Sequence, residues 1–364
     1  MKVLVLMNGL RGIAPGQRFR IEQWAKKLEV QGVSFDFVPF ETPELRRIMY
    51  ARGQFVAKVR ELLWCTVQRA IRVASIRRKW DVVFLYRELL PLGPPILEQV
   101  LGRKKMPIVY DFDDAIFLPN VSDANRQFGF LKWNSKVRTI CRLSSHVTVG
   151  NAYLKDFAGR FSNRVTVIPS TVDTDAYVPK DNVDIKGVPV IGWSGSFSTV
   201  KYLKALEPAL KALRKKLDFR LKVIGCDDYA IDGLEVERRE WNALSEAQDI
   251  RSFDVGIMPL PDDAWTRGKC GMKALLYMSL GVPTIVSPVG MNSEIIKDGE
   301  NGFLAVSDEE WVEKILAIVA DVGLRKKFAR AGRSTVEEHY STRSQIGRLI
   351  EIFEDVQTPT RLYS

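Results

Sequence analysis

Lysines and glycines cluster between residues 266 and 290 in a pattern that suits an anion. Lys269 and Lys273 flank Gly271, and a run with helical spacing begins at Met272. The stretch contains no carboxylate. Glycine lets the backbone approach a ligand closely, and the N–H groups at a helix start carry partial positive charge. The stretch therefore predicts a phosphate site. The alternative is that both lysines are solvated surface residues on a core helix.

A second candidate anion site lies at residues 192–201, where the sequence GWSGSFSTVK follows an apolar strand. Gly195 and Ser196 form the turn, Ser198 or Thr199 can cap the next helix, and Lys201 adds a full charge. A tight structural turn is the alternative. Farther along the chain, Gly290 marks another turn and Glu294 follows it, although Glu294 could simply begin the next helix.

Carboxylates follow an apolar strand in the sequence YDFDDAIF. Asp111 and Asp113 alternate onto one face of that strand, and Asp114 follows them. Such groups can accept a proton from a hydroxyl or orient a sugar, and capping of the next segment is the alternative. The loop after the first strand, with Gly16 and Arg18, is expected on the same side of the molecule.

Strands and helices alternate along the chain, which predicts an α/β fold with parallel sheets covered on both faces. After Pro169 the sequence becomes polar and rich in turn-forming residues, and the alternation of strands and helices then resumes. With 364 residues, two domains are expected. We place them at 1–172 and 184–340, and a terminal helix at about 342–357 could pack back on the first domain.

Composition excludes several classes of protein. Two histidines and four scattered cysteines offer no metal-ligand spacing, so no metal is expected and the cysteines are interpreted as free thiols. No apolar run reaches the roughly 18 residues of a membrane span. The first loop lacks a Gly-x-Gly-x-x-Gly motif, so a nicotinamide cofactor is not favoured.

The net charge of +10 is concentrated in residues 46–79, which hold ten Lys or Arg and one Glu. Apolar residues recur among them with helical spacing. A basic amphipathic helix of this kind can lie on an anionic membrane, at about 1 kcal/mol per cation. A solvated helix face is the main alternative, and nucleic acid is not expected because no recognition motif is present. The predicted membrane contacts are Arg46, Arg47, Arg52, Lys58, Arg60, Arg69 and Arg72.

These motifs together resemble GT-B glycosyltransferases of family four, most clearly over residues 167–351. VIPSTVDTDAYVP resembles the family's interdomain segment, and GVPTIVSPVGMNSEIIKDGENGFLA resembles its donor-domain signature. KCGMKALLYMSLGVP is similar to a bacterial subgroup with a Lys-Cys-Gly-x-Lys motif. The resemblance implies two Rossmann-like domains with parallel sheets facing across a cleft, and retaining transfer of a sugar from a nucleotide-diphosphate sugar without a metal or other cofactor.

The sequence departs from the family at its usual pair of glutamates, which contact the donor. Those positions fall on Gly268 and Leu276, and the family's diphosphate-binding arginine falls on Ser196. Lys201 matches the family lysine, while Lys269 or Lys273 could replace the arginine. Asp262 and Asp263 could replace the missing sugar contact.

The resemblance therefore predicts an enzyme that transfers a sugar to a glycan or lipid-linked acceptor in surface polysaccharide or glycolipid synthesis. Asp113, with Asp114 or Asp111, is expected to position the acceptor. The expected location is cytoplasmic, on the inner face of the cell membrane. A non-catalytic nucleotide-sugar or membrane-binding protein and a nucleotide-sugar epimerase are the alternatives.

Overall fold

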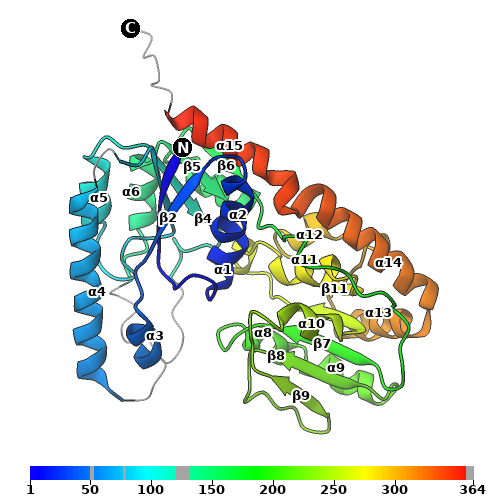
Figure 1. Ribbon diagram of the computed structural model, residues 1–364. Coiled ribbons are helices and arrows are strands. Elements are labelled where there is room, and N and C mark those ends of the chain that lie inside the picture. Colours follow the sequence, from blue (N-terminus) through cyan, green and yellow to red (C-terminus); the bar gives the residue numbers. More distant parts are fainter. Residues whose placement is uncertain (50–52, 77–78, 120–131, 358–364) are drawn as a thin grey trace. The chain divides into compact units, whose positions relative to one another are not determined.

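The computed structural model describes residues 1–49, 53–76, 79–119 and 132–357, and it divides into two compact units (Figure 1). The first unit is Met1–Pro169 with the chain from Gln345 onward, and the second is Ser170–Ser344. The polar stretch expected to be a linker belongs to the second unit. There Arg333 donates to the carbonyl oxygens of Thr174 and Tyr177 at 2.8 and 2.5 Å, which fixes this stretch to the end of a helix.

The first unit contains a parallel sheet of six strands in the order β2-β1-β3-β4-β5-β6. The strands are β1 (Lys2–Met7), β2 (Ser34–Pro39), β3 (Val82–Tyr86), β4 (Ile108–Phe112), β5 (His146–Val149) and β6 (Val165–Val167). The central strands are buried on both faces, which explains their unbroken apolar sequences.

The helices of the first unit are α1 (Pro15–Gln17), the π-helical turn η1 (Arg18–Glu22), α2 (Gln23–Glu29), α3 (Pro43–Met49), α4 (Phe55–Ser75), α5 (Ile96–Gly102), α6 (Lys136–Leu143), α7 (Ala152–Ala158) and most of α15 (Thr342–Gln357). Arg20 has φ −121° and ψ −113° within η1, which breaks the helix at the residue whose guanidinium enters the core.

The terminal helix α15 packs on the first sheet (Figure 1). Leu349 and Phe353 are buried with Val3, Val5 and Phe84 in one core cluster. The rings of Phe84 and Phe353 meet edge to face at 6.1 Å. The helix thereby covers a sheet formed by residues much earlier in the chain.

The second unit contains another parallel sheet of six strands, in the order β12-β11-β10-β7-β8-β9. The strands are β7 (Val190–Ser194), β8 (Arg220–Ile224), β9 (Val236–Arg239), β10 (Val255–Met258), β11 (Thr284–Val286) and β12 (Phe303–Leu304). The helices are α8 (Val200–Ala205), α9 (Glu207–Arg214), α10 (Glu246–Arg251), the 3₁₀ turn η3 (Thr266–Gly268), α11 (Met272–Ser279), α12 (Asn292–Ile295), α13 (Asp308–Ala320), α14 (Val322–Thr335) and the π-helical turn η4 (Val336–Tyr340).

Close packing in the second unit depends on small residues in the central strands. An ideal Cβ on Gly192 would overlap the ring of Phe253, and one on Gly256 would lie 2.8 Å from Cγ of Tyr277. The two rings are themselves in edge contact at 5.8 Å. The predicted α/β class with parallel sheets is confirmed. No helix in the described ranges is long and apolar enough to cross a membrane.

Candidate functional site: a donor edge and an acceptor edge

The loop after β7 is folded tightly against its neighbours. Gly195 donates its N–H to the carbonyl oxygen of Ile224 at 2.9 Å. An ideal Cβ on Gly195 would overlap the indole of Trp193 and lie 2.7 Å from Oγ1 of Thr199. Thr199 precedes α8, but its hydroxyl accepts from the Ser196 N–H at 3.0 Å and does not cap the helix as expected. The loop is therefore held by its own side chains.

The start of α11 requires a glycine. Gly271 has φ 65°, in the left-handed region, and an ideal Cβ there would overlap Ile295 and lie 3.3 Å from Oδ1 of Asn292. The first turn of α11 contains no acidic residue. The free N–H groups of this helix start therefore carry their positive partial charge without a carboxylate to neutralise it.

Lys273 lies in the first turn of α11 and contacts the same indole as the Gly195 loop. Its Nζ is 4.7 Å from the ring centroid of Trp193. Burial, reinforced by the charge of Lys269, lowers the pKa of Lys273 to about 7. No acidic side chain in the described part of the chain forms an ion pair with Lys273. An anion bound beside such a lysine would stabilise its charged form.

The other predicted donor residues lie on separate segments of the second unit and have contacts of their own. Gly290 turns tightly against the η3 segment, since an ideal Cβ there would lie 2.8 Å from the carbonyl oxygen of Arg267. Glu294 is exposed on α12, which packs against Gly271. Lys201 is exposed, with Nζ 5.3 Å from the ring centroid of Tyr202. Lys269 lies over Trp265, with Nζ 5.8 Å from the ring centroid.

Asp262 and Asp263 have structural partners that the sequence did not reveal. Asp262 forms an ion pair with Arg267 at 2.6 Å. Asp263 accepts from the Thr266 N–H at 2.7 Å and from the Thr266 hydroxyl at 2.9 Å, at the start of η3. These contacts account for both carboxylates without a sugar.

In the first unit, a second polar group forms where β3 and β4 end. Asp113 accepts from the Tyr86 hydroxyl at 2.7 Å and from Arg87 Nη2 at 2.7 Å, and Arg87 also pairs with Asp114 at 2.7 Å. Gly16 lies directly against them, because an ideal Cβ there would overlap Tyr86 and lie 2.6 Å from Oδ2 of Asp113. The structure therefore brings together Gly16, Asp113 and Asp114.

The charge state of this group is set by Arg87. Burial disfavours the charged carboxylate of Asp113, but the Arg87 guanidinium and the hydrogen bonds outweigh burial, so the pKa of Asp113 is lowered. Arg87 has φ 62°, an uncommon conformation for a non-glycine residue. An ionised, anchored carboxylate is suited to accept a hydrogen bond from a hydroxyl and unsuited to hold a proton near neutral pH.

The structure places Asp111, predicted as an alternative catalytic residue, in the core of the first unit. Its side chain is fully buried, and both oxygens accept from Arg20, at 2.6 and 2.5 Å. The Thr148 hydroxyl donates to Oδ1 at 2.6 Å. Asp113 follows the end of β4, whereas Asp111 lies within the strand and pairs with Arg20 in the core. Arg18, predicted in the loop after the first strand, is buried in η1 with its guanidinium 4.3 Å from the Phe19 ring centroid.

The basic stretch forms α3 and α4. Arg46 and Arg47 pair with Glu41 and Glu44. Lys58, Arg60 and Arg72 lie on α4, and Arg52 lies outside the described residues. Arg69 is wrong as a membrane contact, because it is buried and donates to the carbonyl oxygen of Met7 at 2.7 Å. Burial lowers the pKa of Arg69 to about 10.

Three residues central to these sites were missed from the sequence. Trp193 and Tyr86 look like ordinary strand residues, and only the packing brings them to the sheet edges. Arg87 could have been found, since it follows a strand directly at the edge where ligands bind in parallel sheets. The four cysteines are free and buried, and the described residues contain no His, Cys, Asp and Glu cluster that could hold a metal.

Residues 188–321 match the family model described as "Glycosyl transferases group 1", so this part of the second unit is a glycosyltransferase group 1 domain. The matched segment includes the Gly195 loop, Lys273 and Gly290. The prediction of a glycosyltransferase is confirmed at the level of this domain. Comparison with curated protein sequences gives no match.

Solved structures resemble the chain over nearly its full length. Sucrose-phosphate synthase from Thermosynechococcus elongatus has a TM-score of 0.72 at 14% identity and covers 98% of both chains. The catalytic domain of starch synthase IV from Arabidopsis thaliana, bound to ADP and acarbose, has a TM-score of 0.70 at 12% identity and covers 98% of this chain and 99% of its own. HepE of Anabaena, in complex with UDP and glucose, has a TM-score of 0.64 at 14% identity, with 97% and 99% covered. The fold is that of GT-B glycosyltransferases.

Proposed function

We propose that the protein transfers a sugar from a nucleotide-diphosphate sugar to a glycan or lipid-linked acceptor, with retention of anomeric configuration, within the family-four-like subgroup marked by Lys-Cys-Gly-x-Lys. The observation that carries the proposal is Lys273. It is a partly buried lysine without a carboxylate partner in the described chain, over Trp193 and beside the Gly195 loop. The UDP and ADP complexes among the similar structures support a nucleotide as the donor's leaving group.

The proposed chemistry at this edge is stabilisation of a leaving diphosphate. Negative charge develops on the diphosphate oxygens as the glycosidic bond breaks, and donors already in place stabilise that charge best. We assign this role to the Lys273 ammonium group and to the N–H groups at the start of α11. Lys201 and Lys269 add longer-range attraction, and Gly290 lets the turn before α12 pack tightly against the η3 segment.

The proposed acceptor edge is the group around Asp113. Its ionised carboxylate can accept a hydrogen bond from an acceptor hydroxyl, while Arg87 and Tyr86 fix its position. Gly16 lets the backbone after β1 pack directly against this group. Surface polysaccharide or glycolipid synthesis is the proposed setting.

The absent glutamates motivate the second candidate, a non-catalytic protein that binds a nucleotide-sugar. Gly268 and Leu276 are both buried and neither can hydrogen-bond a ribose through its side chain. A nucleotide-sugar epimerase is a third candidate, and it would act on the donor without an acceptor.

A thermal-shift screen of UDP, GDP, dTDP, CMP and their sugars tests the proposal first. A ligand present at 100 times its Kd stabilises the native state by about 2.7 kcal/mol, so one nucleotide family should raise Tm clearly. Product analysis with the selected donor then separates the candidates. Transfer to an acceptor supports the proposal, conversion of the donor alone supports an epimerase, and binding without turnover supports the non-catalytic protein.

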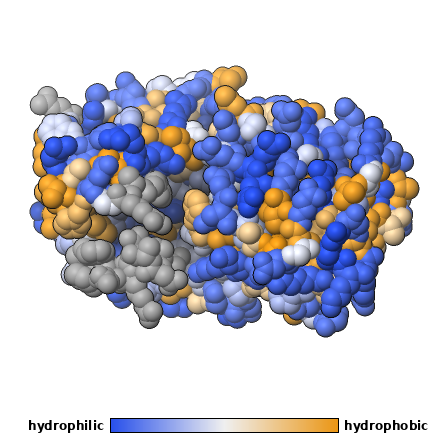
Figure 2. All heavy atoms as spheres, turned by 90° about the horizontal axis from the view of Figure 1, so that it is seen from below, coloured by the Kyte–Doolittle hydropathy of each residue, from blue (hydrophilic) through white to orange (hydrophobic). Residues whose placement is uncertain are grey.

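We further propose that α4 holds the protein to the cytoplasmic face of an anionic membrane. Several apolar residues of α4 are exposed to solvent, with relative exposures between 40% and 79%. They are Phe55, Val56, Val59, Leu63, Trp64, Val67 and Ile71. In Figure 2 hydrophobic residues are visible at the surface on the side where Figure 1 draws α4. The buried residues Cys65, Arg69 and Val73 occupy the opposite side of the helix. The helix is thus apolar on the side that nothing in the described chain covers.

Polar substitutions on that exposed side should weaken membrane binding. We expect Leu63→Gln with Val67→Gln to reduce binding to phosphatidylglycerol vesicles at least tenfold, since each buried CH₂ contributes about 0.8 kcal/mol. Cosedimentation at low salt measures it. The matched control is Val30→Gln with Leu244→Gln, which changes two isolated exposed apolar residues that are 87% and 96% exposed. Equal losses in both variants would contradict the role of α4.

A further inference from the structure

Two hydroxyl groups meet where β7 ends in the second unit, and the proposed donor chemistry does not use either of them. Ser194 is the last residue of β7, and Tyr277 lies in α11. The Ser194 N–H donates to the phenol oxygen of Tyr277 at 2.8 Å. The two hydroxyl oxygens are 3.1 Å apart, within hydrogen-bond distance. The end of the strand is therefore bound to α11 through both the backbone and the side chain of Ser194.

The packing around Tyr277 fixes the position of its hydroxyl group. The side chain is completely buried, and its ring meets that of Phe253 at an interplanar angle of 70°. An ideal Cβ on Gly256 would lie 2.5 Å from Cδ2 of Tyr277, so β10 has a glycine where this ring packs. Burial raises the pKa of Tyr277, and the phenol therefore keeps its proton. Tyr277 thus presents a fixed, protonated hydroxyl to Ser194.

The direction of the hydrogen bond between the two hydroxyls follows from their other contacts. The phenol oxygen already accepts the Ser194 N–H, and Oγ of Ser194 is the acceptor that the described residues offer to the phenol proton. A serine hydroxyl has one proton to donate and can also accept. When Oγ accepts from the phenol, the serine proton has no acceptor among the described residues. That proton is available to a ligand.

Ser194 lies beside the proposed diphosphate site. Side chains alternate along β7, so Ser194 points toward α11 and Trp193 points to the opposite face of the sheet. Lys273 is one helical turn before Tyr277 on α11, yet its Nζ lies 4.7 Å from the Trp193 ring centroid. The lysine side chain must therefore pass around the end of β7, where Ser194 is. Ser194 is 8% exposed and Tyr277 is 0% exposed, so a ligand there can reach the serine but not the phenol.

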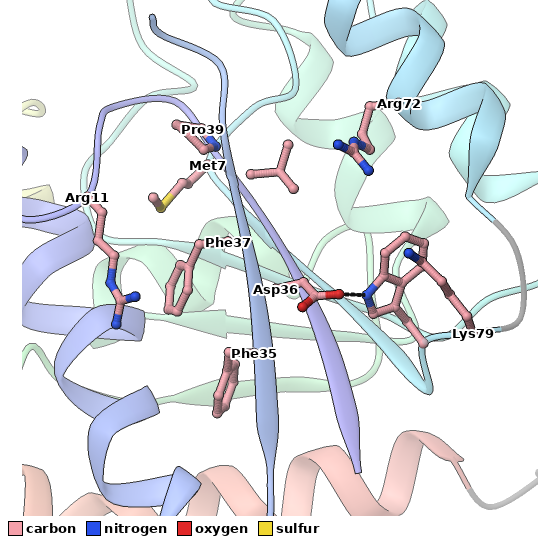
Figure 3. A pocket seen from close by; sticks show the side chains of 10 residues that line it. Met7, Arg11, Phe35, Asp36, Phe37, Pro39, Arg72 and Lys79 are labelled. Atoms are coloured by element: carbon pink, nitrogen blue, oxygen red, sulfur yellow. Dashed lines mark hydrogen bonds between the residues drawn. The ribbon is translucent and has the colours of Figure 1, made fainter. Parts of the chain in front are cut away.

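Cations of the first unit do not converge on one point in this way. A hollow of about 510 Å³ lies along the edge strand β2, with Arg11 and Phe37 on one face of the strand and Arg72 and Lys79 on the other (Figure 3). Because β2 separates these cations, they form no common anion site. The end of β7 instead brings a lysine and a hydroxyl to the same place.

From these observations we propose that Ser194 is a further donor-binding residue, whose hydroxyl donates a hydrogen bond to a diphosphate oxygen beside Lys273. Tyr277 is the positioning residue, because it accepts the Ser194 N–H and turns the serine proton away from itself. The inference rests on the proposed function and deepens it, since it adds two residues to the same site. It also names the diphosphate, and neither the ribose nor the sugar, as the group that Ser194 contacts.

Isothermal titration with inorganic pyrophosphate and with the nucleotide-sugar selected by the thermal-shift screen tests the role of Ser194. Ser194→Ala keeps the backbone N–H that bonds to Tyr277 and removes only the hydroxyl. We expect it to bind both ligands about tenfold more weakly. Ser194→Thr retains a hydroxyl and should keep most of the affinity. The matched control is Ser279→Ala, which removes a buried hydroxyl that donates to the Leu276 carbonyl oxygen at 2.8 Å, and it should bind like wild type.

Tyr277→Phe tests the positioning role. We expect it to weaken binding of both ligands about as much as Ser194→Ala and to lower Tm, because the Ser194 N–H loses its partner. Combining Tyr277→Phe with Ser194→Ala should weaken binding no further than the weaker single variant, since both changes remove the same contact with the ligand. Additive losses of affinity would show that Tyr277 does not act through Ser194 and would overturn its role.

The two ligands separate failure of this inference from failure of the proposed function. Wild-type affinity of Ser194→Ala for both ligands would overturn the inference and leave the role of Lys273 intact. A loss for the nucleotide-sugar alone would place the hydroxyl on the ribose or the sugar and overturn the diphosphate contact. If wild type binds pyrophosphate through Ser194 but binds no nucleotide-sugar, the proposed function fails and the diphosphate site stands. If wild type binds neither ligand, both proposals fail.

Discussion

Replacing Lys273 by methionine should lower the affinity for the nucleotide-sugar donor by about 10- to 100-fold, because a hydrogen bond to a charged group contributes roughly 1.5–3 kcal/mol. Methionine retains the contact with Trp193 and removes the charge. Isothermal titration with the nucleotide-sugar selected by the thermal-shift screen measures the change. Lys269→Met is the matched comparison and should lose less, since Lys269 lies over a different ring, that of Trp265.

The same substitution should stabilise the protein without ligand. The folded-state pKa of about 7 is below the ordinary 10.5, so between these pH values the unfolded chain binds a proton that the folded protein does not. The free energy of unfolding at this site therefore rises as pH increases from 7 to 10.5, and the charged lysine destabilises the fold at and below neutral pH. A higher Tm for ligand-free Lys273→Met at pH 7, with weaker donor binding, would separate loss of function from loss of folding.

Donor affinity should also depend on pH. Above pH 7 the neutral lysine must take up a proton when the diphosphate binds, so affinity should fall by up to about tenfold per pH unit. A nucleotide-sugar is the right probe because its diphosphate does not titrate in this range. The slope should vanish in Lys273→Met and flatten in Lys273→Arg. A wild-type affinity constant from pH 6.5 to 8.5 would show that Lys273 does not contact the donor.

Replacing Asp111 by asparagine should destabilise the first unit by about 3–5 kcal/mol, because removing one partner leaves the other charge buried and unpaired. Arg20 and Asp111 are both completely buried, and the guanidinium is also bound to the Ile168 carbonyl oxygen at 2.7 Å. This loss is a large part of the 5–15 kcal/mol that stabilises a typical domain. Urea unfolding, read as a change in midpoint at constant slope, measures it.

Two comparisons make that result specific. Arg20→Met with Asp111→Leu removes both charges and should recover part of the lost stability, because no unpaired charge is left. Arg47→Ala breaks an exposed pair with Glu44 and should leave the midpoint unchanged. If Asp111→Asn unfolds at the wild-type midpoint but loses sugar transfer, Asp111 is catalytic after all and its assignment to the core is mistaken.

The sequence signals for the proposed donor edge are local, so the sequence could indicate them without a tertiary structure. A glycine before a helix, lysines within one turn of it and the absence of acids are properties of adjacent residues. The α/β class followed from alternation for the same reason. Residues 167–351 also carried the resemblance that gave the fold and the kind of enzyme.

Only the tertiary structure decided which charged residues are buried and which are exposed. Asp111 lies in β4 and Asp113 directly follows that strand, yet only Asp111 forms a fully buried ion pair with Arg20, which is 91 residues away in sequence. In α4 the sequence predicted an amphipathic helix, but the fold buries the side with Cys65 and Arg69 and exposes the apolar row with Leu63 and Val67. Sequence fixes which residues share a helix side or a strand face. Which side faces inward depends on contacts between residues far apart along the chain, and those exist only once it is folded.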